Sequence, residues 1–202
     1  MTQVPGTAGY GANAAALAQQ YESLKFADVH RVVLHCFPPP PARVLDIGAG
    51  SGRDAAALAA LGHRVVAVEP TPELRMEGMR RHAALPIEWV DDHLPALHAT
   101  RAGGRRHDLI LLTAVWMHLD AGEREVAMEA VAALLADGGQ VVMSLRHGPV
   151  PQGRRMFSVS AEETTRLAER HGLVLSFLGE REDMLGRGDV TWSFLVLLRP
   201  GA

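Results

Sequence analysis

The chain has 202 residues, of which 48% are hydrophobic and 21% charged, and its net charge is −3, values that suit one globular domain with a sizeable core. This slightly acidic balance gives no overall attraction to nucleic acid or to an anionic membrane surface. Cys36 is the one cysteine, which excludes an internal disulfide and favours a reducing, cytoplasmic location. We expect neither a signal peptide nor a membrane span, because no basic stretch precedes an apolar core near the N-terminus and no apolar run approaches bilayer length.

The first forty residues are predicted to be mainly helical. An alanine-rich stretch at 13–20 favours a helix by intrinsic propensity. Apolar residues then recur at helical spacing over 21–37, which predicts a second helical stretch. The prolines at 38–41 end that stretch and form a stiff, extended connector.

The stretch at 43–69, RVLDIGAGSGRDAAALAALGHRVVAVE, has the pattern of a strand, a glycine turn, a helix, a second strand and an acid. Gly48, Gly50 and Gly52 alternate at the tip of the first strand, where glycine allows positive φ and close approach of a ligand to the backbone. Glu69 ends the second strand, at the edge where open α/β sheets bind ligands. Its carboxylate is therefore placed to accept hydrogen bonds from a ribose diol.

The spacing of the glycines distinguishes between two nucleotide ligands. A dinucleotide fingerprint requires G-x-G-x-x-G, but the sixth position counted from Gly48 is Arg53. The observed pattern is D-I-G-A-G-S-G, in which Asp46 stands two residues before the first glycine. Together with Glu69 at the expected distance after the glycine turn, this pattern resembles the first motif of the class I S-adenosylmethionine-dependent methyltransferases. It disfavours a nicotinamide dehydrogenase.

The resemblance extends over about residues 41–199. It implies an α/β fold, namely a doubly wound, seven-stranded and mostly parallel sheet with an antiparallel last strand, which is the Rossmann-like methyltransferase fold. It further implies a catalytic domain over 41–202, preceded by a helical lid segment over 1–40 within one compact domain.

Most elements after Glu69 can be placed by pattern. We expect a helix from Pro72 to about His82, strands at 87–90, 108–113 and 140–145, a helix at 122–136, a helix after Ser160 with Glu163 completing a capping box, and two last strands at 173–178 and 192–198. Thr100–His107 is expected to be a polar loop.

S-adenosylmethionine is the cofactor that the resemblance implies, with S-adenosylhomocysteine as product. In the family the glycine loop passes under the methionine and ribose parts of the cofactor, and the acid that corresponds to Glu69 holds the ribose hydroxyls. Asp92, or Asp91 as the second choice, corresponds to an acid that accepts a hydrogen bond from the adenine amino group; the alternative is a turn acid that caps a short helix. The expected cofactor-binding residues are Asp46, Gly48, Ala49, Gly50, Gly52, Arg53, Glu69, Pro70, Asp92, His93, Thr113 and Ala114.

The family also places an N-terminal helix over the cofactor as part of a lid. Tyr10, Tyr21, Phe26 and His30 are therefore lid candidates, although the same side chains suit packing of that segment onto the sheet. The expected substrate-binding residues are Tyr21, Trp116 and Arg146. The guanidinium of Arg146 suits an acidic substrate group, or else it holds a loop.

Methyl transfer from a sulfonium is an in-line displacement in which the leaving sulfur becomes neutral. Orientation of the reactants can supply ~7–11 kcal/mol of the barrier, whereas a general base is required only for an acceptor such as a hydroxyl. His118 and His147 follow strands and are the candidates for that base; alternatively, His118 caps a turn and His147 orients Arg146. No metal is expected, because His93 and His98 lack a third ligand at a recognisable spacing.

These observations predict methyl transfer to an O, N or S nucleophile of a small molecule. We expect no nucleic-acid or membrane partner, and the sequence names neither the acceptor nor the oligomeric state. Two alternatives stay open: a cofactor-binding regulator without turnover, and a methyltransferase of RNA or protein. The second alternative would use a basic rim formed by Arg101, Arg105, Arg106, Arg154 and Arg155.

Overall fold

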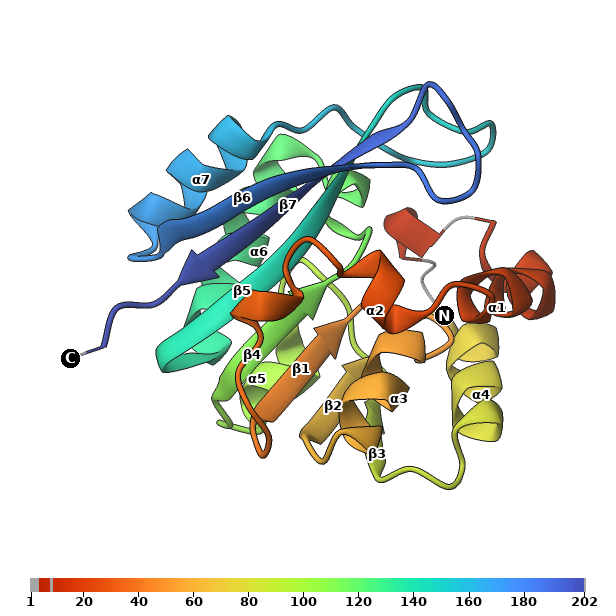
Figure 1. Ribbon diagram of the computed structural model, residues 1–202, viewed down its shortest axis with the longest axis horizontal. Helices are drawn as coiled ribbons and strands as arrows, with labels where there is room; N and C mark the ends of the chain where they lie inside the picture. Colours follow the sequence, from red (N-terminus) through yellow and green to blue (C-terminus); the bar gives the residue numbers. More distant parts are fainter. Residues whose placement is uncertain (1–3, 8, 202) are drawn as a thin grey trace.

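The computed structural model describes residues 4–7 and 9–201, which form a seven-stranded sheet with helices on both of its faces (Figure 1). The strands are β1 (Arg43–Ile47), β2 (Arg64–Val68), β3 (Ile87–Val90), β4 (His107–Leu112), β5 (Leu135–His147), β6 (Val174–Glu182) and β7 (Thr191–Leu198). Their order in the sheet is β3-β2-β1-β4-β5-β7-β6. Every neighbouring pair is parallel except those of β7, which runs antiparallel to β5 and to β6. The predicted fold class is confirmed.

Helices connect these strands and cover the sheet. They are α1 (Ala14–Glu22), α2 (Phe26–Val29), α3 (Arg53–Ala60), α4 (Pro72–Arg81), α5 (His98–Ala102), α6 (Ala121–Leu134) and α7 (Ala161–Arg170). Short 3-10 turns lie at Pro5–Thr7, Gly11–Asn13, Leu34–Cys36 and Trp116–His118. No helix in the described part of the chain is long and apolar enough to cross a membrane.

Two apolar clusters hold the layers together, one on each face of the sheet. Leu45 and Ile110 pack with residues of α6 and α7, whereas Val44 and Leu109 pack with residues of α3. Adjacent strand residues point to opposite faces, so a strand buried on both faces is a continuous apolar run. In Figure 1, α2 and α3 lie in front of the sheet and α6 lies behind it.

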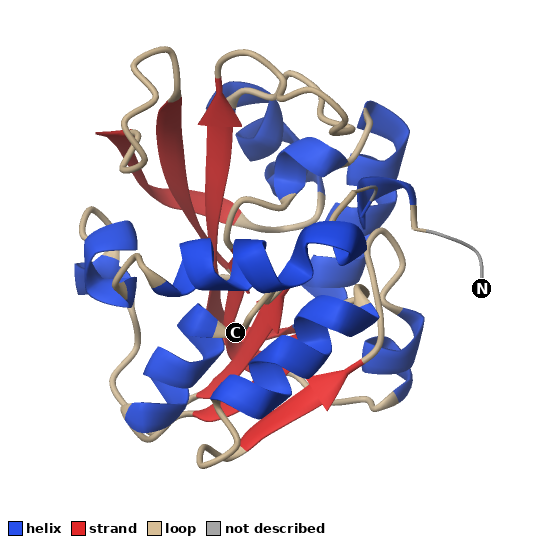
Figure 2. Ribbon diagram, turned by 90° about the vertical axis from the view of Figure 1, so that its right-hand side faces the viewer, coloured by secondary structure: helices blue, strands red, loops and turns tan. Residues whose placement is uncertain are grey.

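The carboxyl ends of β1, β2, β4 and β5 meet at one edge of the sheet, because the register pairs Ile47 with Val68 and Leu112 with Met143. The chain before β1 reaches this edge through α1. Ala14 and Ala18 of that helix pack on Leu74 of α4. Figure 2 shows the same arrangement turned by 90°, with helices packed along the strands.

The predicted helical stretch at 21–37 is broken in the structure. The helix α1 ends at Glu22, Lys25 is extended, and only Phe26–Val29 and a 3-10 turn at Leu34–Cys36 follow. Within this stretch Val29, Val32 and Val33 are β-branched and favour helix weakly, and Val33 is fully buried against the sheet. The apolar spacing therefore reports contact with the sheet rather than one continuous helix.

Three further predictions differ from the structure in detail. The helix α5 occupies part of the expected loop at 100–107, because Asp92 accepts hydrogen bonds from the backbone N–H and the hydroxyl of Thr100 in its first turn. The strand β5 begins at Leu135 and so includes the expected turn. The capping box after Ser160 is half formed, since the Glu163 carboxylate accepts from Arg124 instead.

Candidate functional site

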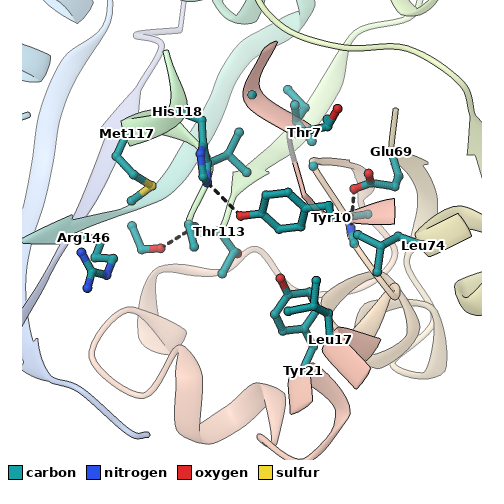
Figure 3. Close-up of a pocket in the computed structure, with 18 of the residues that line it drawn as sticks. Thr7, Tyr10, Leu17, Tyr21, Glu69, Leu74, Thr113, Met117, His118 and Arg146 are labelled. Carbon is teal, nitrogen blue, oxygen red and sulfur yellow. Dashed lines mark hydrogen bonds between the residues drawn. The ribbon is translucent and has the colours of Figure 1, made fainter. Parts of the chain in front are cut away.

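A cavity of about 480 Å³ opens at the carboxyl edge of the sheet. Its walls come from the glycine loop, the ends of β1, β2, β4 and β5, the N-terminal segment, and the chain from Arg181 to Phe194. Its volume falls in the range typical of small-molecule sites. Figure 3 shows Tyr10 across its middle, with Glu69 on one side and Arg146 on the other.

The glycine loop lies beneath this cavity and is held to the end of β2 by backbone hydrogen bonds. The backbone N–H groups of Gly48 and Ala49 both donate to the carbonyl of Val68. Gly48 has φ +71°, and a Cβ built on it would lie 2.6 Å from Cγ2 of Val115. Gly50 has φ +59° and also lines the cavity. Glycine is required at both positions by conformation, and at Gly48 also by space.

Gly52 is not among the residues that line the cavity. It stands at the N-cap of α3 with φ +85°, and a Cβ there would lie 2.7 Å from the indole of Trp89. The third glycine of the motif therefore makes room for a packed tryptophan. Because Gly52 does not line the cavity, a contact between it and the cofactor stays a prediction.

Glu69 lies where the sequence predicted it, at the end of β2 and on the cavity wall. One carboxylate oxygen accepts from the N–H of Gly50 at 2.8 Å, and the other accepts from the N–H of Thr71 at 2.8 Å. Burial raises the pKa of Glu69, and the backbone and side chain of Thr71, together with the N–H of Gly50, partly offset that effect. Each oxygen retains a further lone pair, so the carboxylate can still accept hydrogen bonds from a ligand.

A buried polar network lies beneath the loop. Asp54 accepts from Arg53, from His30 and from Thr113 at 2.7–2.8 Å. Burial acts to raise the pKa of Asp54, but His30 and Arg53 outweigh burial and hold it below its usual value. Burial and the nearby Asp54 raise the pKa of Asp46, whose Oδ2 has no hydrogen-bond partner among the described residues.

The alternative considered for Arg53, an ion pair with Asp54, is present, and Arg53 nevertheless lines the cavity. Asp92 also lines it, but its carboxylate accepts from the N–H of His93 in addition to the two donors of Thr100. Asp92 thus caps α5, and its contact with adenine stays a prediction. The other predicted cofactor-binding residues on the cavity wall are Asp46, Ala49, Pro70, His93, Thr113 and Ala114.

His118 is the candidate base that reaches the cavity. Its Nδ1 lies 2.9 Å from the carbonyl oxygen of Arg155, which can only accept, so Nδ1 carries the proton. Its Nε2 therefore accepts from the hydroxyl of Tyr10 at 3.2 Å. Burial lowers the pKa of His118, as do Arg154 and Arg155. The imidazole is thus held neutral, with its lone pair toward the cavity.

His147 and Trp116 do not reach the cavity, contrary to prediction. Consecutive residues of β5 face opposite sides, so Arg146 lines the cavity while His147 contacts Ser193 at 2.8 Å. The 3-10 turn at Trp116–His118 turns the indole fully into the core and presents Met117 and His118 to the cavity. The turn is too short to show a periodic pattern, so the sequence did not indicate which of its side chains would face the cavity.

The lid candidates divide into two pairs. Tyr10 and Tyr21 line the cavity, and the guanidinium of Arg154 lies 3.8 Å from the centre of the Tyr10 ring. His30 is 1% exposed and is bonded to Asp54, and Phe26 packs on it with ring centroids 4.8 Å apart. These two side chains anchor the segment and do not line the cavity.

A family model described as a methyltransferase domain matches residues 17–176. The chain belongs to this family. The predicted family and enzyme class are confirmed, and S-adenosylmethionine is the cofactor that this membership indicates. A curated relative, the protein-L-isoaspartate O-methyltransferase of Chlorobium limicola, is 55% identical over 51 residues, which make up 24% of this chain and 24% of that protein. The match to that relative therefore spans about a quarter of its length.

Several solved structures share the fold of this methyltransferase. A TehB-like SAM-dependent methyltransferase from Corynebacterium glutamicum has a TM-score of 0.68 at 22% identity, over 93% of this chain and 98% of that one. The 1,6-didemethyltoxoflavin-N1-methyltransferase of Burkholderia thailandensis, with bound 1,6-didemethyltoxoflavin and S-adenosylhomocysteine, has a TM-score of 0.66 at 19% identity, over 99% and 92%. The putative methyltransferase in complex with the Haloferax volcanii Trm112 activator has a TM-score of 0.73 at 14% identity, over 96% and 98%.

The residues of the methyltransferase site fit S-adenosylmethionine. The loop at Gly48 and Gly50 offers bare backbone, Glu69 retains lone pairs for a ribose diol, and the buried Oδ2 of Asp46 has no partner in the described chain. These residues would hold the cofactor at the Glu69 side of the cavity. No group of three His, Cys, Asp or Glu side chains in the described ranges is arranged to hold a metal ion.

Four of the five arginines considered for a basic rim around an RNA or protein substrate do not lie together. Arg105 pairs with Glu88 and Arg106 donates to the carbonyl of Leu135, both beside the amino-terminal end of β4. Arg154 and Arg155 instead line the cavity at the carboxyl edge. The two groups of arginines therefore lie at opposite edges of the sheet.

Proposed function

We propose that this methyltransferase transfers the methyl group of S-adenosylmethionine to an O, N or S nucleophile of a small molecule, by in-line displacement and with His118 as proton acceptor. The observation that carries the proposal is the neutral imidazole of His118, whose Nε2 faces the cavity and already accepts a hydrogen bond from a hydroxyl. The bound cofactor supplies an electrophilic methyl group on a sulfonium sulfur.

The protein contributes position and a proton acceptor. Figure 3 places Tyr10 between the Glu69 side of the cavity and the side where Met117, His118 and Arg146 lie. We assign the first side to the cofactor and the second to the methyl acceptor. An acceptor hydroxyl that replaced the Tyr10 hydroxyl would meet the lone pair of His118, which removes the proton as the methyl group is transferred.

The segment before β1 serves as the lid in this proposal. Thr7, Tyr10 and Tyr21 line the cavity, and α1 packs on α4 through small apolar side chains. Closure of such a segment excludes water and orients the reactants, which is where most of the rate gain in this reaction originates. The single, unpaired cysteine supports a cytoplasmic setting for the reaction.

Two measurements test the proposal in sequence. Calorimetry with S-adenosylmethionine and S-adenosylhomocysteine should show binding; absence of binding at millimolar concentration would reject the cofactor assignment. Incubation of a metabolite extract with methyl-labelled cofactor should then yield a labelled small molecule by mass spectrometry. Cofactor binding without any labelled product would favour a regulator without turnover, and label in RNA or protein alone would favour the macromolecular alternative.

A further inference from the structure

Two arginines and a tryptophan form a row across the three strands at one end of the sheet. The register pairs Arg146 of β5 with Trp192 of β7, and Trp192 with Arg181 of β6. Residues directly opposite one another in antiparallel strands project from the same face, so the three side chains lie side by side. All three line the cavity. Two residues further along β7, Phe194 also lines it, and the Arg181 guanidinium lies 5.4 Å from the centre of its ring.

Each guanidinium of this row uses only one of its ends. Nη1 of Arg146 donates to the carbonyl of Pro149 at 2.8 Å, and Nη1 of Arg181 donates to that of Glu182 at 3.0 Å. Nε of both side chains is buried and has no hydrogen-bond partner in residues 4–7 and 9–201. Neither Nε nor Nη2 of these two arginines therefore donates a hydrogen bond to another group in the described residues.

The same edge binds a carboxylate elsewhere in the protein. Nε and Nη2 of Arg43 donate to the two oxygens of Asp108, and Nε and Nη2 of Arg187 donate to those of Asp183. This paired geometry is the strong mode in which arginine recognises carboxylates and phosphates. In Arg146 and Arg181, the Nε and Nη2 atoms that could bind an oxyanion in this way have no such partner among the residues that the structure describes.

Burial lowers the pKa of both arginines, and it outweighs Asp183, which acts through space to raise both, and Asp189, which raises that of Arg146. Asp183 lines the cavity, but its two oxygens accept from the Arg187 side chain and N–H, from the N–H of Leu185 and from Nε1 of Trp192. No carboxylate in the described part of the chain forms an ion pair with Arg146 or Arg181. Arg181 is only 8% exposed. A buried cation without a counter-ion is unfavourable, and an anionic ligand would remove that penalty.

We propose that Arg146 and Arg181 bind an oxyanion, a carboxylate or a phosphate, carried by the methyl acceptor, whose apolar body packs on Trp192. The inference rests on the proposed function and narrows it to an anionic small molecule. The position suits the acceptor rather than the cofactor, since Figure 3 shows Arg146 on the Met117 side of the cavity, across Tyr10 from Glu69.

Calorimetry on the protein saturated with S-adenosylhomocysteine tests the proposal. Benzoate and phenyl phosphate are the two anionic probes, and benzamide is the neutral control of matched shape. At least one anion should bind tenfold or more tightly than benzamide, and that advantage should fall by about tenfold in Arg146→Gln and in Arg181→Gln, since charge-assisted hydrogen bonds are lost. The stronger probe identifies the class of oxyanion.

Further variants separate a local effect from loss of structure. Arg101→Gln, which removes an exposed arginine of α5, should leave all three affinities unchanged. Arg181→Lys keeps the charge but lacks the planar edge, so it should bind the anions more weakly than the parent protein and more tightly than Arg181→Gln. Melting temperatures of the variants, each with S-adenosylhomocysteine, report whether the fold is kept.

Four outcomes would overturn the proposal. In the parent protein, these are binding of benzamide as tight as that of the anions, or no binding of either anion. In Arg146→Gln and Arg181→Gln, they are unchanged anion binding in both variants, or a tenfold loss of affinity for S-adenosylhomocysteine. The last result would mean that the arginines hold the cofactor's own carboxylate. Failure of the parent protein to bind S-adenosylhomocysteine would instead reject the proposed function, and this is measured before any probe is added.

Discussion

The hydroxyl of Tyr10 lies 3.2 Å from Nε2 of His118, across 108 residues of sequence. The bond links the N-terminal segment to the proposed proton acceptor. Because Nδ1 donates to the carbonyl of Arg155, Nε2 has a lone pair to offer, and Tyr10 occupies it. A bound acceptor competes for the same lone pair, so substrate binding and movement of this segment are coupled in the proposed mechanism.

Replacement of His118 tests the catalytic assignment. For a hydroxyl acceptor, His118→Asn should lower kcat by ~10²–10⁴-fold, because proton removal is lost, while the affinity for S-adenosylhomocysteine stays within a factor of about two. Steady-state kinetics and calorimetry measure the two quantities. His147→Asn is the matched control, because that side chain contacts Ser193 outside the cavity and should keep kcat near the parent value. Equal losses in the two variants would contradict the assignment.

The dependence of rate on pH gives an independent readout. Burial lowers the pKa of His118 from its ordinary value of 6.5, so the neutral, proton-accepting form should persist below that pH. The value of kcat/KM should accordingly be level near neutral pH and fall as acid protonates the imidazole, with a midpoint under 6.5. The limb should be absent in His118→Asn. A midpoint above 6.5 would show that another group limits the rate.

Glu69 provides a test of the cofactor site. Glu69→Ala should weaken the binding of S-adenosylmethionine by more than about tenfold, since the two expected hydrogen bonds to the ribose and the bond from the N–H of Gly50 would be lost. Asp91→Ala is the control, because Asp91, the second choice for the adenine contact, is exposed, pairs with Arg75 and does not line the cavity. Calorimetry should find the control unchanged. Weakening in both variants would return Asp91 to the list of cofactor ligands.

The space at Gly48 can be measured by a double-mutant cycle. Gly48→Ala places a Cβ against Cγ2 of Val115, and its φ of +71° remains unfavourable for alanine. Val115→Ala removes the contact but not the conformational strain of ~1–2 kcal/mol. Urea unfolding should therefore show that Gly48→Ala destabilises the protein less when Val115 is already alanine. Additive losses would show that the contact is unimportant.

The individual strands and the position of Glu69 could be predicted from the sequence because their signals are local, whereas the seven-stranded sheet was implied by the family resemblance. Each parallel strand is an apolar run, and the alternating glycines with a following acid specify one kind of loop. The prediction of His118 was also local, since it required only the end of β4.

The direction of individual side chains needed the tertiary structure. His147 differs from Arg146 only by one step along a strand, and the sequence did not say which of them faces the cavity. Arg181 and Trp192 were not predicted as site residues at all, because their proximity to Arg146 depends on the register of three strands. Likewise Gly52 belongs to the motif, yet its neighbour Trp89 lies far along the chain.

The contact between Gly52 and Trp89 includes a third residue, Gly78 of α4, on which a Cβ would also collide with the indole. The Trp89 ring thus packs between the N-cap residue of α3 and the middle of α4. A side chain at either glycine would collide with Trp89, and a smaller residue in place of Trp89 would leave a void between α3 and α4. We expect Gly52, Gly78 and Trp89 to covary among homologues. A redesign of the surface of α4 should therefore change these three residues together or not at all.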